Sequence, residues 1–79
     1  MPLYFMDIWE GAELIPDDVG TQCRDLHEAE VMAANTVASL ARECWSRVDP
    51  ADISIIVRDD SGREVLTLTA TLQIKRTLG

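Results

Sequence analysis

Few residues of this 79-residue sequence are of a type that could perform chemistry, and the first to consider is its single histidine. His27 could act as a general base, because the pKa of a free imidazole lies near neutrality. It stands beside Glu28 and Glu30 in a charged stretch, and no nucleophile is near it in the sequence. We therefore interpret His27 as a solvated surface residue.

Two acidic loops could offer oxygen ligands to a cation: Asp17-Asp18 and Asp59-Asp60-Ser61-Gly62. A calcium loop of the helix-loop-helix type needs alternating acidic residues over about twelve positions, and neither loop has them. Aspartate and glycine are turn formers, which accounts for both loops. The four glycines are scattered singly, so they form no phosphate-binding loop. The serines have no elbow or triad context. We expect no enzymatic activity and no cofactor.

Cys23 and Cys44 are the only cysteines. One histidine and two cysteines at unrelated spacings do not match a structural zinc site, so we expect no bound metal. No secretory signal is recognised, because Asp7 interrupts the stretch from Met1 to Trp9, which also lacks a basic flank. We expect a cytoplasmic protein in which both thiols are free and buried.

The composition predicts one small acidic domain over residues 1–79. An apolar fraction of 47% is too high for a disordered chain. No run approaches the roughly 20 apolar residues of a membrane span, so we expect no membrane partner. Fourteen acidic against seven basic residues give a net charge of −7, which phosphate backbones repel. The one basic pair, Lys75-Arg76, is too short to overcome this, and we expect no nucleic-acid partner.

Any functional residues must be positioned by one long helix, predicted from Asp25 to Val48. Asp25 is a good N-cap residue, and Glu28 completes an acidic variant of the capping box. Asp49-Pro50 is the stop signal, because the residue before a proline is driven out of the α region. The apolar spacing forms one helical stripe: Leu26, Ala29, Ala33, Val37, Leu40 and Cys44. A second apolar set lies beside it: Val31, Ala34, Ala38, Ala41, Trp45 and Val48.

The remaining chain is predicted to form strands, because apolar residues alternate in it with a period of two. The strand ranges are 2–10, 13–15 and 52–59, with a final strand over 64–76 and a short extended piece at 21–24. Gly62 provides a left-handed turn position in the hairpin between the last two strands. The first strand has apolar groups on both faces, which places it inside the sheet. We predict an α+β domain of β-β-α-β-β order, with an antiparallel sheet of about four strands and the helix across one face.

One helix covers one face of such a sheet, so apolar groups on the other face are left for a partner. The predicted interaction face consists of Tyr4, Met6, Ile8, Ile56, Val65, Thr67 and Thr69, opposite a face that bears Phe5, Ile55 or Leu68. This favours an interaction module that associates with a second copy or with another protein.

Two other hypotheses remain open. A small-ligand or regulatory domain could hold a pocket between helix and sheet, lined by Trp9, Trp45 and Cys44. The net charge of −7 would also suit an antitoxin-like regulator that binds a basic partner, although such a charge equally keeps a small protein soluble.

Several short motifs occur in a familiar order: Met1-Pro2-Leu3-Tyr4-Phe5-Met6-Asp7, Pro16-Asp17-Asp18-Val19-Gly20, Asp25-Leu26 with Ala29 and Ala33, and Val57 to Arg63 before an apolar strand. Together they resemble a bacterial family of small proteins, many from rhizobia and their relatives, defined only as a domain of unknown function. Its pattern begins with a proline-aromatic-aromatic-aspartate strand. Met6 departs from it, since a second aromatic is common there, and Trp9 and Trp45 are not typical positions. The resemblance implies a compact α+β domain and supplies no activity and no site residues.

Overall fold

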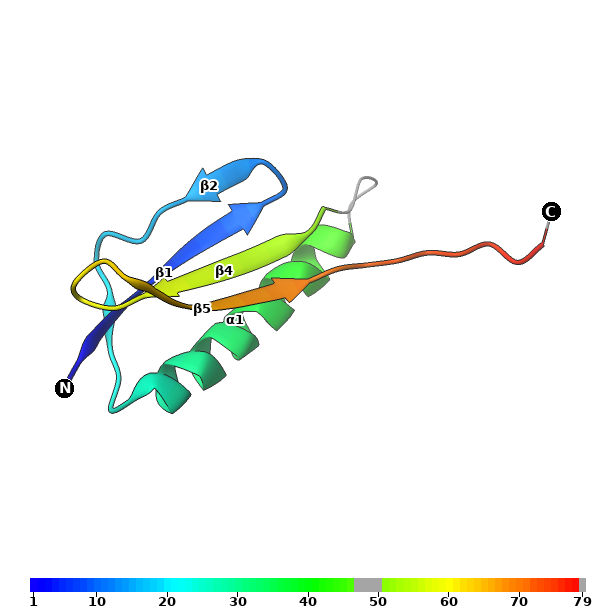
Figure 1. The fold of residues 1–79 in the computed structure, drawn as a ribbon. Helices are drawn as coiled ribbons and strands as arrows, with labels where there is room; N and C mark the ends of the chain where they lie inside the picture. The colour runs from blue at the N-terminus through cyan, green and yellow to red at the C-terminus, as the bar shows by residue number, and fades with distance from the viewer. Residues whose placement is uncertain (47–50, 79) are drawn as a thin grey trace.

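The computed structural model describes residues 1–46 and 51–78. Its elements are β1 (Leu3–Glu10), β2 (Glu13–Ile15), β3 (Thr21–Gln22), α1 (Leu26–Trp45), β4 (Ile53–Arg58) and β5 (Glu64–Ala70). Figure 1 shows a twisted sheet with the helix lying along it. The predicted α+β class and β-β-α-β-β order are confirmed, with the two-residue β3 as a fifth strand.

The sheet is antiparallel throughout, with the strand order β2-β1-β4-β5. β1 lies inside the sheet, as its two apolar faces predicted. On its outer side β1 pairs with β2 at residues 8–10 and with β3 at residues 3–4. The ladder between β1 and β2/β3 is therefore interrupted at residues 5–7, where another group must satisfy the backbone.

The register of the pairing decides which side chains share a face, because residues directly opposite one another project to the same side. Ile55 in β4 lies opposite Ile8 in β1 and Leu68 in β5. Ile56 lies opposite Asp7 and Thr67 on the other face. A register shift after Val57 marks a bulge in the hairpin. The sheet thus has an apolar face and a mixed face.

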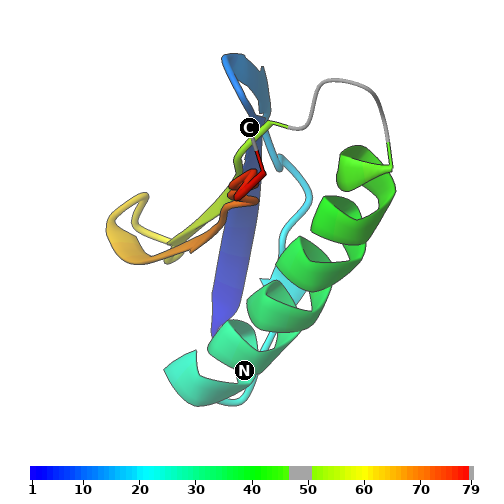
Figure 2. The ribbon, with the colours of Figure 1, turned by 90° about the vertical axis from the view of Figure 1, so that its right-hand side faces the viewer.

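The helix covers only the apolar face, and Figure 2 shows it on one side of the sheet. It begins as predicted, since the Asp25 carboxylate accepts a hydrogen bond from the Glu28 amide at 2.9 Å. Glu28 accepts from the Arg24 amide, one residue before the N-cap. The core contains these residues: Cys23, Ala29, Ala33, Val37, Ala41, Cys44, Ile53, Ile55 and Val57. Small helical side chains let α1 pack closely on β4 and β5.

Of two predicted boundaries, one lies outside the described residues and one differs from the structure. The helix ends at Trp45 with Ser46 as C-cap; the predicted end at Val48 and the Asp49-Pro50 stop signal lie outside the described residues. The final strand ends at Ala70 and not at Arg76. Residues 71–78 continue the alternation of β5 but have no partner strand, so they form no ladder. Figure 1 shows this segment leading away from the sheet.

Candidate functional site

The sheet face opposite α1, here called the open face, is the candidate functional surface. Its pairing register places on it Phe5, Asp7, Trp9, Leu14, Ser54, Ile56, Arg58, Glu64, Thr67 and Thr69. No helix of the described residues lies over it (Figure 2). It combines aromatic and aliphatic groups with hydroxyls, and Ser54 and Thr69 share a hydrogen bond of 2.9 Å across β4 and β5.

The seven residues predicted to form one interaction face lie on two faces, which corrects that prediction. The residues that pack against the core are Tyr4, Met6, Ile8 and Val65. The residues on the open face are Ile56, Thr67 and Thr69. The physical reason is the register, because Ile8 is directly opposite Ile55 beneath the helix. The sequence established that side chains alternate between two faces in each strand. It did not establish which of the two sets of side chains in β1 faces the helix.

Arg58 and Asp7 form the polar centre of the open face. The Arg58 Nε donates to Asp7 Oδ2 at 2.6 Å, and its Nη2 donates to Asp7 Oδ1 at 3.1 Å. This bidentate geometry is the strong form of a charge-assisted pair. Nη2 also donates to the Asp17 carbonyl at 3.2 Å, and the guanidinium carbon lies 5.1 Å from the centroid of the Phe5 ring. Arg58 is thus engaged on three sides.

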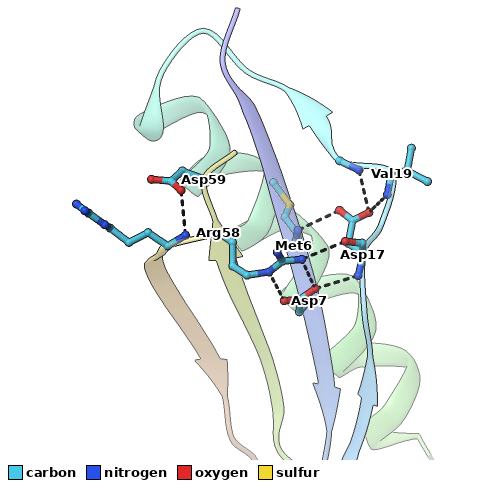
Figure 3. A network of polar contacts seen from close by, with 8 residues as sticks. Met6, Asp7, Asp17, Val19, Arg58 and Asp59 are labelled. Carbon is cyan, nitrogen blue, oxygen red and sulfur yellow. Dashed lines mark hydrogen bonds and ion pairs between the residues drawn. The ribbon is translucent and has the colours of Figure 1, made fainter. Parts of the chain in front are cut away.

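Asp17 fills the interruption in the ladder along β1 (Figure 3). Its Oδ2 accepts a hydrogen bond from the Met6 amide at 3.0 Å, and its own amide donates to Asp7 Oδ1 at 2.9 Å. Its Oδ1 accepts from the amides of Val19 and Gly20, both at 3.0 Å. One aspartate therefore takes the place of a strand residue beside β1 and closes its own turn. We call Asp7, Asp17, Arg58 and the amides they bind the carboxylate network.

Both carboxyl groups of this network are held in the charged form. The hydrogen bond from the Arg58 side chain is the main cause of the lowered pKa of Asp7. Partial burial alone would raise the pKa of Asp17, but hydrogen bonds from three backbone amides outweigh it and lower that pKa. A carboxylate with a lowered pKa and occupied lone pairs is a poor general base. The carboxylate network is thus suited to fixing the loop at residues 16–20 against the open face.

The other residues considered for chemistry are dispersed. His27 is exposed on α1, as predicted. Cys23 and Cys44 are free and buried, and burial, followed by the nearby carboxylates, raises the pKa of the Cys23 thiol. In the second acidic loop, Asp59 Oδ1 accepts from Ser61 and Arg63 amides, which is turn chemistry. Within residues 1–46 and 51–78, no three His, Cys, Asp or Glu side chains cluster as metal ligands would.

The predicted pocket between helix and sheet cannot form from the residues assigned to it. Trp9 lies opposite Ser54 on the open face, whereas Cys44 is buried in the core beneath α1. The Trp45 indole packs at the helix end and donates to the Ala51 carbonyl at 3.1 Å. The described part of the chain contains no pocket. The two tryptophans are therefore separated by the sheet, for the same reason of register as above.

The sequence pattern places Phe5, Asp7 and Trp9 on one face of their strand, but we did not predict that Arg58 lies on the same surface. A signal was present, because the mixed face of β4 carries Arg58 and one face of β1 carries Asp7. An arginine on one face of a strand and an aspartate on one face of another indicate that these two faces lie on the same side of the sheet when the strands pair. Asp17 offered no comparable signal, since its partners are backbone amides from another part of the chain.

The fold and this surface define a small α+β domain whose antiparallel sheet is covered by a helix on one face. A family model described as a domain of unknown function, DUF6894, matches residues 3–71. The chain belongs to this family. No curated protein and no solved structure shows significant similarity to this chain. The expected resemblance to a family of unknown function is confirmed at this level.

Proposed function

We propose that the chain is a single-domain, non-catalytic protein-interaction module that associates with a second copy of itself. The observation that carries this proposal is the one-sided covering of the sheet. Phe5, Trp9 and Ile56 stand on the open face and are only partly buried. Apolar groups gathered on one uncovered surface mark sites of contact with protein.

The chemistry of the open face supports contact with protein rather than catalysis. The one arginine on it is already satisfied by Asp7, by a carbonyl and by an aromatic ring. No free nucleophile stands beside a base among the described residues. Hydroxyls and aromatic rings around an ion pair that is already formed suit a mixed polar and apolar protein interface.

The proposal also covers the cellular location of the protein and the kind of organism it comes from. We infer a bacterial, cytoplasmic protein that binds neither membranes nor nucleic acid. The net charge of −7 supports the absence of a nucleic-acid partner, because an acidic surface and phosphates repel each other. None of the described helices is long and apolar enough to cross a membrane.

The first experiment is a solution mass by light scattering across a dilution series at moderate salt. We expect twice the 8.8 kDa of one chain, with the mass falling only at high dilution. A thin core in a domain of this size gives self-association a stabilising role, since small domains bury a small fraction of their surface. A mass of one chain at every concentration would contradict the proposal.

A further inference from the structure

Among the described residues, the outer edge of β5 and the segment that follows it form the longer of the two unpaired edges of the sheet. β5 is hydrogen-bonded on one side only, to β4. Residues 71–78 then continue in the direction of β5 without secondary structure (Figure 1). Ile74 is 74% exposed there. A long edge with unpaired amides and carbonyls is a template for pairing with another strand.

The segment keeps the two-residue period of the strand it extends. In β5, Leu66 and Leu68 project to the helix side, together with Ala70. Leu72 and Ile74 continue this phase, while the intervening residues are polar. The apolar stripe of β5 is thus carried past the last paired residue, as in a strand whose neighbour is missing.

Antiparallel pairing of two identical edges is self-complementary, and the side-chain pattern selects its register. A shift by one residue would place apolar groups opposite the polar face, so only registers that keep the faces matched are allowed. If Ala70 faces Ala70 of the second copy, Leu72 faces Leu68 and Ile74 faces Leu66. Beyond Leu66, the bulge at Val65 turns Glu64 to the open face, where it lies opposite Arg58, so Lys75 is the basic residue that shares a face with Glu64 across the pair.

Charge favours this register over its neighbours. All fourteen acidic residues lie at or before Glu64, and residues 71–78 carry only Lys75 and Arg76. The basic segment of one copy therefore lies against the acidic body of the other. If the two-fold axis passes through residue 71 or 72 instead, Lys75 faces Thr67 or Thr69 and no opposite-charge pair forms on the open face. Opposite charges directly across an antiparallel pair are stabilising.

We propose that two copies of this chain pair edge to edge through residues 64–76, antiparallel and centred on Ala70. This rests on the proposed self-association and assigns it to the β5 edge, so that the uncovered apolar groups of the open face are left for a second protein partner. The sheets then join in the order β2-β1-β4-β5-β5-β4-β1-β2, and a two-fold axis crosses the sheet. Both helices lie on one side. Both open faces lie on the other side, where they form one continuous surface for a protein partner.

The test measures the dimer dissociation constant of full-length variants by sedimentation or light scattering. Ile74→Asp places a carboxylate against Leu66 of the second copy, and we expect the constant to rise about tenfold or more. Leu78→Asp makes the same change beyond the paired register and is expected to leave the constant unchanged. Ile74 and Leu78 are both exposed in the single chain, so neither change unfolds it.

A charge exchange tests the register itself. Lys75→Glu and Glu64→Lys are each expected to weaken the dimer about two- to threefold at low salt. The double variant restores the pair and the net charge, and its dissociation constant is expected to return to that of the natural chain. Arg42→Glu changes the net charge as Lys75→Glu does, but on α1, and controls for general repulsion.

The outcomes separate this inference from the proposed function. A dimer that tolerates Ile74→Asp but is lost in Ile56→Lys, and not in Val31→Lys, would show pairing through the open face. That result would overturn the edge pairing and leave the interaction module standing. Single variants that weaken the dimer without recovery in the double variant would overturn the register. A natural chain that is monomeric throughout would overturn both proposals.

Discussion

Replacing Asp17 by alanine tests whether one side chain takes the place of a strand beside β1. The change removes the acceptors of three backbone amides, and the Met6 amide is then left facing an empty edge. A part-buried hydrogen bond to a charged group contributes about 1.5–2 kcal/mol, and the two turn bonds add about 0.5–1 kcal/mol each. We expect Asp17→Ala to lower the free energy of unfolding by about 2.5–4 kcal/mol. That is a large share of the total for a domain of this size, about 4–12 kcal/mol.

The assay is urea unfolding followed by far-ultraviolet circular dichroism and tryptophan fluorescence. Asp18→Ala is the matched control, since Asp18 is the exposed neighbour of Asp17; it is expected to change the unfolding free energy by less than about 0.5 kcal/mol. The intermediate variant Asp17→Asn keeps one oxygen for the turn but can present an amide donor to Met6. Its free energy of unfolding is expected to lie between those of Asp17→Ala and Asp18→Ala. Equal midpoints for Asp17→Ala and Asp18→Ala, with unchanged slopes, would refute this reasoning.

Three further predictions follow from the described contacts. Because the carboxyl groups of the carboxylate network have lowered pKa values when folded, their stabilisation is complete above their unfolded pKa of about 3.9 and is lost as the pH falls through the lowered values. The urea midpoint should therefore drop below about pH 4, and drop less in Asp17→Asn; an identical acid dependence would contradict this. Gly20→Ala should destabilise the fold by about 1–2 kcal/mol more than Gly62→Ala in urea unfolding. Both glycines have a positive φ, but only at Gly20 would a Cβ lie 3.0 Å from the Phe5 ring; equal losses would exclude the steric contribution. Cys23 should react slowly with a thiol reagent at mildly alkaline pH, because burial raises its pKa and blocks access. Rapid stoichiometric labelling of the folded protein would refute that expectation.

The open face and the β5 edge are suited to different kinds of contact. On the open face, aromatic and aliphatic side chains surround a satisfied ion pair, which suits contact through side chains. At the β5 edge, unpaired backbone groups suit strand addition. The proposed dimer uses the β5 edge and leaves the open face available for another protein. The two proposals therefore depend on different residues.

The amino-acid sequence by itself determined the local elements of this protein. The helix start follows from Asp25 and the absence of glycine and proline up to Trp45, which are local effects of capping and backbone freedom. The strands follow from their two-residue period, and the hairpin turn follows from Gly62, whose φ is +88°. The antiparallel α+β class follows in turn, because one apolar helix and several short strands have few ways to bury their faces.

The tertiary structure decided which side chains of β1 face the helix and at which residue β5 ends. Both depend on pairing between segments distant in the sequence: Ile8 opposite Ile55, and Ala70 as the last residue with a partner on β4. The final strand continues in pattern to Arg76 but stops where its neighbour stops, because a strand exists only as part of a ladder. Asp17 likewise acquires its role only when folding brings β1 beside it. Alternation is a property of one segment, whereas register and pairing are properties of two.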